Sequence, residues 1–440
     1  MKYLIYTLTC LVAAIPSLAE SVALTPGALP GYVKEWKLSN PVELQLTGEV
    51  TSIDLASLKY LPESVVSLDL SGLTVKGLEL RNSKYLGRTE FSDGELPPYA
   101  LFSTNVREVK LPASLTVIGE AAFAETPLER VDFPSSLRYI GDRAFYLCKS
   151  LKTADLTTTS VSTIPEQCFY GCVSLADASF PPVLSSIGNR AFMKSAVTRM
   201  NIPGVSEIGE YAFAEMPALV EVTMRNGVKI GEGAFFGDGM LGQMSGMPAN
   251  SPALAMANNG VRTLTGYIGG EVVDEGAYAN LMVDTIVIHP SVREIRNNAF
   301  RNATGLKAVD VSERGGDVPV ASEDAFAGID VGKVSLSVAK GDEDAWRNAP
   351  VWKDFSITSE GTGIAGVVSD GVRISVTKGA GGIVIKSNVN IDDVAVYSMD
   401  GIVLYSAKPG SDTCVAGTFD EKDLIVRIVA GGVTKIVKIL

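Results

Sequence analysis

Apolar and polar residues alternate over short segments of this chain, and such segments return at a nearly fixed interval. Each segment places two apolar residues two positions apart, and a polar residue stands between them. Alternation with a period of two is typical of a short β-strand that buries one face. The pairs are Val109/Leu111, Val131/Phe133, Ala154/Leu156, Ala178/Phe180, Met200/Ile202, Val222/Met224, Ile286/Ile288, Val309/Val311 and Val334/Leu336.

An aromatic residue preceded by a small residue follows each of these pairs. The aromatic residues are Phe123, Phe145, Phe169, Phe192, Phe213, Phe235, Tyr278, Phe300 and Phe326. The first five spacings are 22, 24, 23, 21 and 22 residues, the next is 43, and the last two are 22 and 26. A fixed period in this range indicates stacked units that share one core, because no single unit can bury its own apolar face.

A third recurring element is Ile-Gly, which stands between the strand and the aromatic residue. It occurs at Ile118-Gly119, Ile140-Gly141, Ile187-Gly188, Ile208-Gly209 and Ile230-Gly231, with Ile164-Pro165 as a variant. We expect the glycine to adopt a positive φ in a sharp turn. Each unit is then a strand, a loop, a second short strand, a tight turn and a short helical or 3₁₀ turn. Successive units would lie roughly 4.7–4.9 Å apart along the strand ladder.

The unit from Leu128 to Phe145, LERVDFPSSLRYIGDRAF, closely resembles the BspA-type leucine-rich repeat of bacterial surface proteins. The likeness recurs in most units between residues 105 and 357. It implies an exported, cell-surface or secreted protein whose repeats mediate adhesion or protein–protein contact. The expected fold is a β-rich leucine-rich-repeat solenoid of short strands and short helical or 3₁₀ turns. No catalytic or binding residues are carried over with the resemblance.

Residues 20–104 are expected to form an N-terminal cap with atypical repeats. Glu43–Leu46 and Ser67–Leu70 are strand candidates that lie 24 residues apart. The segment Tyr99–Phe102 resembles a degenerate form of the aromatic turn, with Phe102 placed 21 residues before Phe123.

The first nineteen residues have the pattern of a secretory signal peptide. Lys2 precedes an apolar stretch from Tyr3 to Ile15, and the small residues Ser17 and Ala19 suit cleavage after Ala19. A retained anchor, or a lipoprotein acylated at Cys10, is the alternative. The signal peptide implies that the mature chain lies at the cell surface or is secreted. No later segment is long and apolar enough to span a membrane.

The repeat is disturbed between Phe235 and Tyr278. Residues 237–260 are rich in Gly, Met, Pro and Asn, and they include Met244 and Met256. One interpretation is a degenerate repeat whose methionines fill an irregular core. The other is a loop inserted on one face of the solenoid for binding.

The last unit ends in an aromatic cluster that consists of Trp346, Trp352 and Phe355. We expect it to close the exposed end of the core, as a terminal unit must, and a carbohydrate-stacking platform is the alternative. Residues 358–371 then form a linker rich in Ser, Thr and Gly. Residues 372–440 show period-two segments without the repeat and predict a small β-sandwich, with a hairpin turn at Asp400-Gly401.

This last region is also similar to the C-terminal sorting domains of type IX secretion. The likeness rests on Val396–Gly401 and on Ile425–Ile428 before a basic terminal strand. The usual Gly-Tyr ahead of the penultimate strand is absent, and Asp423-Leu424 stands in its place. A purely structural domain therefore remains open beside an export signal.

Composition and residue types argue against several functional classes. A net charge of −12 disfavours a nucleic-acid partner, because phosphate-binding surfaces are basic. His289 is the only histidine, and no Gly-x-Ser-x-Gly nucleophile turn is present. Cys168 and Cys172 have no second Cys/His pair at metal spacing. We therefore expect no enzymatic activity, no cofactor and no metal.

Cys148 and Cys172 each follow their aromatic residue by three positions in adjacent units, so they should be neighbours in the stack. Buried thiols are favoured. A disulfide remains open for an exported protein, although stacking alone does not give the side-chain dihedral that a disulfide requires.

If a partner binds, the outward positions of the first strands are the candidate surface, which we call the strand-face strip. Its residues are Glu108, Lys110, Arg130, Asp132, Asp155, Asp177, Ser179, Arg199, Asn201, Glu221 and Thr223. The sequence predicts a monomeric, non-catalytic recognition protein that binds a protein or a glycan there. A glycan-binding accessory protein and a structural surface-layer component are the alternatives.

Overall fold

In a computed structural model of the protein, residues 19–360 are described except for 81–83, 226, 242, 246, 247, 249, 262, 266, 267 and 315. Residues 367–369, 372–379, 382–398, 402–417, 419, 424–431 and 433–439 are described in the C-terminal region. Most of the predicted signal peptide, parts of the predicted linker and the Asp400-Gly401 turn lie outside these residues.

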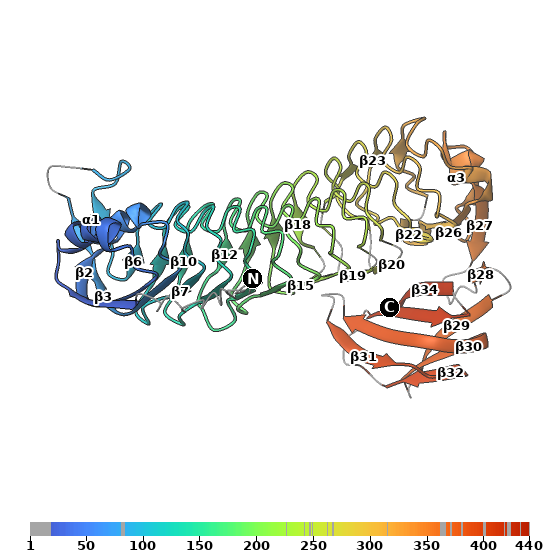
Figure 1. The fold of residues 1–440 in the computed structure, drawn as a ribbon. Coiled ribbons are helices and arrows are strands. Elements are labelled where there is room, and N and C mark those ends of the chain that lie inside the picture. Colours follow the sequence, from blue (N-terminus) through green and yellow to red (C-terminus); the bar gives the residue numbers. More distant parts are fainter. Residues whose placement is uncertain are drawn as a thin grey trace, which may run out of the picture.

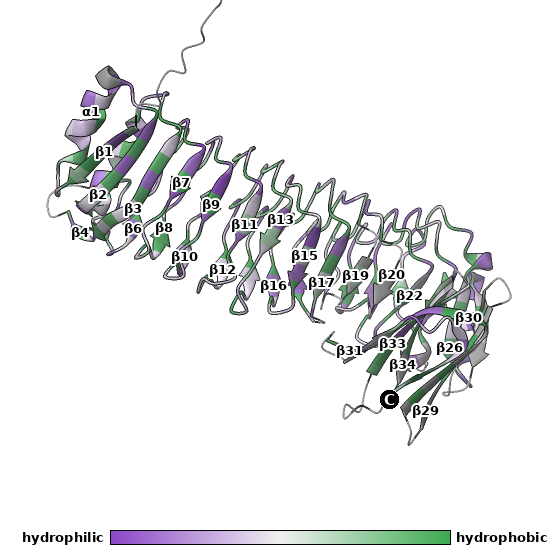
Figure 2. Cartoon of the chain, turned by 60° about the horizontal axis from the view of Figure 1, so that its bottom comes forward, coloured by the Kyte–Doolittle hydropathy of each residue, from purple (hydrophilic) through white to green (hydrophobic). Residues whose placement is uncertain are grey.

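The first strands of successive units run parallel and side by side along one face of an elongated solenoid (Figures 1 and 2). In order they are β1 (Ala19–Leu24), β2 (Glu43–Thr51), β3 (Ser67–Lys76), β7 (Glu108–Lys110), β9 (Arg130–Asp132), β11 (Thr153–Asp155), β13 (Asp177–Ser179), β15 (Arg199–Ile202), β17 (Glu221–Met224), β19 (Gln243–Ser245), β20 (Thr263–Thr265), β22 (Thr285–Val287), β24 (Ala308–Asp310), β26 (Ser335–Ala339) and β27 (Ser356–Glu360). Parallel pairing in register makes each unit one rung of the stack.

A second parallel ladder of shorter strands forms another face. Its members are β6 (Glu95–Leu96), β8 (Val117–Ile118), β10 (Tyr139–Ile140), β12 (Thr163–Ile164), β14 (Ser186–Ile187), β16 (Glu207–Ile208), β18 (Lys229–Ile230), β21 (Val272–Val273), β23 (Glu294–Ile295) and β25 (Val320–Ala321). The turn that carries the aromatic residue follows each of these strands. The predicted leucine-rich-repeat solenoid is confirmed.

The two ends of the solenoid carry the few helices. At the N-terminal end lie α1 (Leu29–Ser39), α2 (Ser52–Leu55) and the 3₁₀ helix η1 (Ala56–Tyr60). Toward the C-terminal end lie η2 (Ser312–Arg314), η3 (Val331–Lys333), α3 (Glu343–Arg347) and η4 (Trp352–Asp354). Trp36 of α1 is buried at one end, and Trp346 and Trp352 are buried at the other.

A column of aromatic rings forms the centre of the core. Consecutive rings from Phe123 to Phe235, and from Tyr278 to Phe326, stack with centroids 5.0–5.8 Å apart. Burying each phenylalanine side chain contributes roughly 1.5–3 kcal/mol. Trp352 and Phe355 pack edge-on against Phe326, which closes the column as the sequence predicted.

The glycine of Ile-Gly does not have a positive φ, so the predicted reason for it was wrong. A Cβ on Gly119, Gly141, Gly188, Gly209 or Gly231 would lie 2.5–2.8 Å from a backbone nitrogen of the preceding rung. Close approach of two rungs is thus what excludes a side chain there.

Left-handed φ values occur instead at two positions of the turn, two residues before and two residues after the aromatic residue. Ala121 (φ 49°) and Glu125 (φ 62°) flank Phe123 in this way. Their N–H groups donate to Asp142 O and Tyr146 O of the next rung, at 2.9 and 2.7 Å. These ladder hydrogen bonds offset the cost of positive φ, and the left-handed residues are the reason that the turn does not become a helix.

The described residues between Phe235 and Tyr278 form one further rung, in register with its neighbours. Met256 occupies the aromatic column: Phe235 N donates to Ala255 O, and Met256 N donates to Ala277 O. Met244 and Met256 are fully buried. This supports the degenerate repeat with methionines in the core over the inserted binding loop.

The N-terminal aromatic turn is shifted by one residue relative to the prediction. Tyr99 N donates to Glu120 O and Leu101 N to Ala122 O, so Leu101, not Phe102, is the residue that precedes Phe123 in the column. Leu101 is fully buried, whereas Phe102 is half-buried and packs against Tyr99.

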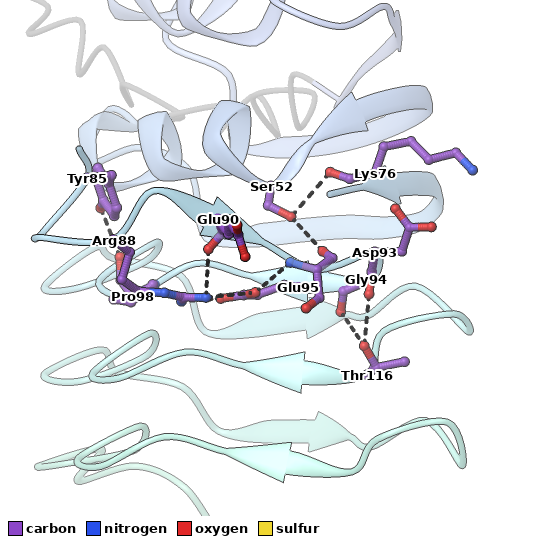
Figure 3. Close-up of polar contacts among 11 residues, drawn as sticks. Ser52, Lys76, Tyr85, Arg88, Glu90, Asp93, Gly94, Glu95, Pro98 and Thr116 are labelled. Atoms are coloured by element: carbon purple, nitrogen blue, oxygen red, sulfur yellow. Dashed lines mark hydrogen bonds and ion pairs between the residues drawn. The ribbon is translucent and has the colours of Figure 1, made fainter. Parts of the chain in front are cut away.

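A hairpin of β4 (Leu78–Glu79) and β5 (Glu90–Phe91) leaves the solenoid after β3. Figure 3 shows part of its anchorage, in which the Arg88 guanidinium pairs with the buried Glu95 carboxylate. Ser92 N donates to the same carboxylate at 2.9 Å. Ser52 Oγ donates to Lys76 O and Ser92 O at the base of the hairpin. The pairing satisfies a carboxylate that would be costly to bury alone.

The C-terminal region is an antiparallel sheet with its own core. Its strands are β28 (Val367–Ser369), β29 (Val372–Gly379), β30 (Gly382–Ser398), β31 (Val403–Ala407), β32 (Ser411–Ala416), β33 (Leu424–Ala430) and β34 (Val433–Ile439). The long β30 pairs with β29 and β32 through its first half, and with β31 and β33 through its second half. This arrangement agrees with the predicted small β-sandwich. No helix among the described residues has the length and apolar character to cross a membrane.

Candidate functional site

The strand-face strip lies where the alternation predicted it, on the outward side of β7, β9, β11, β13, β15 and β17. Its side chains are exposed, apart from Glu221 and Thr223, which are half-buried. The intervening apolar residues are buried, except that Ala178 and Phe180 are only partly so. Figure 2 shows polar and apolar bands alternating across these strands.

Strand register places opposite charges beside each other along the strip. Glu108 pairs with Arg130 and Lys110 with Asp132, while Arg199 pairs with Glu221 and forms an ion pair at 3.4 Å. The Arg130 guanidinium also donates three hydrogen bonds to the Asp132 carboxylate on its own strand. Exposed pairs of this kind contribute about 0–1 kcal/mol each, so they order the surface more than they stabilise it.

The strip is hollowed at its N-terminal end, where β1, β2, β3, β7 and β9 line a groove of about 560 Å³. Glu108, Lys110, Arg130 and Asp132 of the prediction line this groove. The other predicted residues, Asp155, Asp177, Ser179, Arg199, Asn201, Glu221 and Thr223, lie outside it along the same face.

Sequence reasoning missed the groove residues that precede β7, namely Glu20, Ser21, Glu43, Gln45, Ser67 and Asp69. A signal for them was present: Glu43-Leu-Gln and Ser67-Leu-Asp alternate as Glu108-Val-Lys does. Because these segments were assigned to a cap, their outward residues were not added to the strip. Glu20 is held in place by Trp36, whose Nε1 donates to its Oε1 at 2.9 Å.

The groove is predominantly acidic. Five of its lining residues carry carboxylates and two are cationic; these are Glu20, Glu43, Asp69, Glu108 and Asp132, and Lys110 and Arg130. Burial alone would raise the pKa of Asp69, but hydrogen bonds from Ser71 and the ion pair with Lys110 outweigh it and lower that pKa. Asp69 therefore stays ionised at neutral pH and contributes one of the negative charges of the groove.

The only histidine of the chain lies outside the groove. His289 is exposed at the end of β22 and its Nδ1 lies 2.8 Å from Ser291 Oγ, far along the chain from the strip. In the described part of the chain, no group of three or more His, Cys, Asp or Glu residues could hold a metal ion.

The four described cysteines are free and buried. Cys148 Sγ donates to Phe123 O at 3.0 Å, and Cys172 Sγ donates to Phe145 O at 3.1 Å. Each thiol therefore provides a hydrogen bond to a backbone carbonyl of the rung before it. Burial raises the pKa of Cys148 to about 12, and it raises that of Cys172 as well. These thiols stay protonated and inert, because the thiolate is the nucleophilic form.

Comparison with known families gives one match. The model of the BspA type leucine rich repeat region matches residues 94–220, 158–244 and 271–366, with six copies of the repeat. These stretches together cover more than half of the chain and include every rung from β8 to β18. Among curated proteins, none is significantly similar to this chain.

The solved structures to which this chain is similar include three bacterial proteins. A leucine-rich repeat protein from Bacteroides ovatus is 18% identical, with 79% of this chain and 92% of that chain covered and a TM-score of 0.44. The pneumococcal vaccine antigen PcpA is 14% identical, with 72% and 80% covered and a TM-score of 0.37. A leucine-rich repeat protein from Eubacterium ventriosum is 14% identical, with 71% and 90% covered and a TM-score of 0.38.

Proposed function

Because the chain belongs to the BspA-type leucine-rich repeat family, we propose that it is an exported, non-catalytic recognition protein. It acts at the cell surface or after secretion, as a monomer, and its strand-face strip binds a protein or glycan partner. Export is supported by the signal-peptide pattern of residues 1–19.

The acidic groove at the N-terminal end of the strip is the observation that carries this proposal. Flat, solvated sheet faces are common in such proteins, but this one is hollowed and bears an excess of carboxylates over cations. Complementary charge favours a cationic segment of a protein partner, and it accelerates the encounter as well as selecting the partner.

Charge reversal in the groove tests the proposal. The variant Glu43→Lys/Glu108→Lys changes two exposed groove residues that are not part of the core. We expect it to lose at least tenfold in affinity for a protein captured from surface extracts by the wild-type chain, measured by surface plasmon resonance at two salt concentrations.

The matched control is Glu207→Lys/Glu232→Lys, which makes the same change in net charge away from the groove, on β16 and in a neighbouring turn. Binding should survive in this control. Equal losses in both variants would show that overall charge, not the groove, governs the interaction.

The domain division belongs to the same proposal: a cap at 20–104, a solenoid at 105–357, a linker at 358–371 and a sandwich at 372–440. The sandwich is a candidate sorting domain on the strength of its sequence likeness. Mass spectrometry of released and cell-associated protein would reveal whether the C-terminal domain is removed after export. Identical, full-length masses in both fractions would contradict a cleaved sorting signal.

A further inference from the structure

A second hollow lies at the turns that carry the aromatic residues, on rungs distant from the acidic groove. Its volume is about 560 Å³, and it is lined by the turns around Met256, Tyr278 and Phe300. This volume falls within the range of about 300–1,000 Å³ that small-molecule sites occupy.

Small residues line the floor of this hollow. The residue after the column residue is Ala257 and Ala279 here, whereas it is Tyr146 and Tyr170 in two earlier rungs, where the two rings stack 5.1 Å apart. Alanine holds the same position in some other rungs, and Gly233 matches Gly276 two residues before the column, so these residue types are not unique to the hollow. In the hollow, however, Ala257, Gly276 and Ala279 lie together on two adjacent rungs, and their short side chains leave a concave surface.

A row of asparagines forms one side of the hollow. Asn258, Asn280 and Asn302 follow the aromatic column by two residues in three consecutive rungs, and all three are exposed. Asn280 Nδ2 donates to Asn258 Oδ1 at 2.5 Å, so these two amides are aligned along the stack.

Asparagine tolerates the left-handed φ of this position, but the fold does not require it there. The same position is Glu125, Leu147, Gly171, Lys194, Glu215, Gly237 or Gly328 in other rungs, all with positive φ. Three successive amides beside a hollow are therefore specific to this part of the solenoid.

The backbone N–H groups of the three asparagines are already engaged, so these residues offer a ligand their side-chain amides. The backbone N–H groups of Asn258 and Asn280 already donate to Ala279 O and Arg301 O of the following rungs, at 2.9 and 2.7 Å. Glu275 and Arg301 are the only charged lining residues, and their charges are opposite. An extended peptide that adds to a sheet would need an unpaired strand edge, and the lining residues of the hollow all lie in turns.

We propose that this hollow binds a neutral oligosaccharide. Amide, carboxylate and guanidinium groups together offer hydrogen-bond donors and acceptors for sugar hydroxyls. The alanine and glycine floor admits a pyranose ring, and the balanced charge favours no ionic ligand. This site is separate from the strand-face strip, so either could exist without the other.

Isothermal titration with the full mature chain tests the proposal, with cellohexaose, maltohexaose, xylohexaose, mannohexaose and lacto-N-tetraose as probes. At least one of these should bind. The variant Asn280→Gly/Asn302→Gly keeps the left-handed backbone, removes two amides, and should weaken that binding about tenfold or more. Arg301→Ala should weaken it as well.

The matched control is Glu215→Gly, at the same position of the repeat and with the same kind of φ (54°), outside the hollow. It should bind as the wild type does. The proposal is overturned if none of the five probes binds, or if the asparagine variant binds as tightly as the wild type. Loss of binding in Glu43→Lys/Glu108→Lys alone would place the sugar in the acidic groove and would equally overturn it.

Discussion

Buried polar side chains occupy one position of the repeat, three residues after the aromatic residue. They are Thr104, Thr126, Cys148, Cys172, Ser195, Asp238 and Asn259, where Leu101 and Met256 take the place of the aromatic residue before Thr104 and Asn259. Thr126, Cys148 and Cys172 donate to carbonyl oxygens of the aromatic column. Asp238 differs: its Oδ1 accepts from Met216 N at 2.8 Å, but its Oδ2 has no hydrogen-bond partner among the described atoms.

Replacing Asp238 with asparagine should change how stability depends on pH. Burial raises the pKa of Asp238 well above its usual value, so the folded chain holds this proton to a higher pH than the unfolded chain does. The stabilisation that the protonated Asp238 carboxyl gives the folded chain is present at low pH, and it is lost as the pH rises through the pKa of Asp238 in the folded chain. Asp238→Asn should remove this loss and raise the free energy of unfolding at neutral pH by about 1–3 kcal/mol, measured by urea denaturation.

Asp155→Asn is the control, because the pKa of Asp155 is shifted in the opposite direction and stability should depend on pH in the opposite sense. Hydrogen bonds from Thr157 lower the pKa of this exposed carboxylate, so its small contribution is present at neutral pH and is lost as the pH falls. If Asp238→Asn left the pH profile unchanged, or destabilised the protein near pH 7, the account of a protonated buried carboxyl would be wrong.

At the scale of the repeat element, the glycine that follows the second strand sets how closely rungs approach. Gly141→Ala would place a Cβ 2.5 Å from Glu120 N, so the two rungs would have to separate. We expect a loss of about 1–3 kcal/mol in the free energy of unfolding, as for other overpacked sites.

Gly31→Ala is the matched control, because Gly31 lies in α1 and a Cβ there would meet nothing within 4 Å. Alanine favours a helix over glycine by about 1 kcal/mol, so this variant should be neutral or stabilised. A Gly141→Ala protein as stable as the wild type would show that the rungs can separate at no cost.

The sequence predicted those elements whose place in the repeat follows from the residue type alone, whether apolar, polar or aromatic. Alternating pairs such as Val109/Leu111 gave the strands, and recurring phenylalanines gave the column. Met256 and Leu101 were missed because an unbranched or branched aliphatic side chain can fill an aromatic position, and only the inter-rung hydrogen bonds reveal the substitution.

The candidate site was predicted in part for a related reason. Outward residues such as Lys110 and Arg130 follow from alternation, so the strip could be named. The groove could not be predicted in this way, because its shape depends on how β1, β2 and β3 continue the parallel strand ladder. The asparagine hollow depends on which rungs lie side by side, and the 43-residue spacing concealed the rung of Met256.

At the scale of the whole molecule, the solenoid and the C-terminal sheet have separate hydrophobic cores. The core of the solenoid ends at Trp352 and Phe355, and that of the sheet begins at Ile374. A chain of residues 20–360 should therefore fold, and its melting temperature should lie within a few degrees of that of the solenoid transition in the mature chain.

Differential scanning calorimetry of both chains gives this comparison. The mature chain should show one transition that the shorter chain retains and a second that it lacks. Aggregation of the shorter chain, or a large fall in its melting temperature, would mean that the sheet stabilises the solenoid.

Site-specific photo-crosslinking tests most directly the claim that the strand face is where a partner binds. A photoreactive phenylalanine analogue placed at Gln45 or Lys110 lies in the acidic groove, whereas at Lys229 it lies on the other strand ladder. All three positions are exposed, so each can react with a bound partner. The account predicts a covalent adduct with the same partner from Gln45 and Lys110, and none from Lys229. An adduct from Lys229 alone would contradict it.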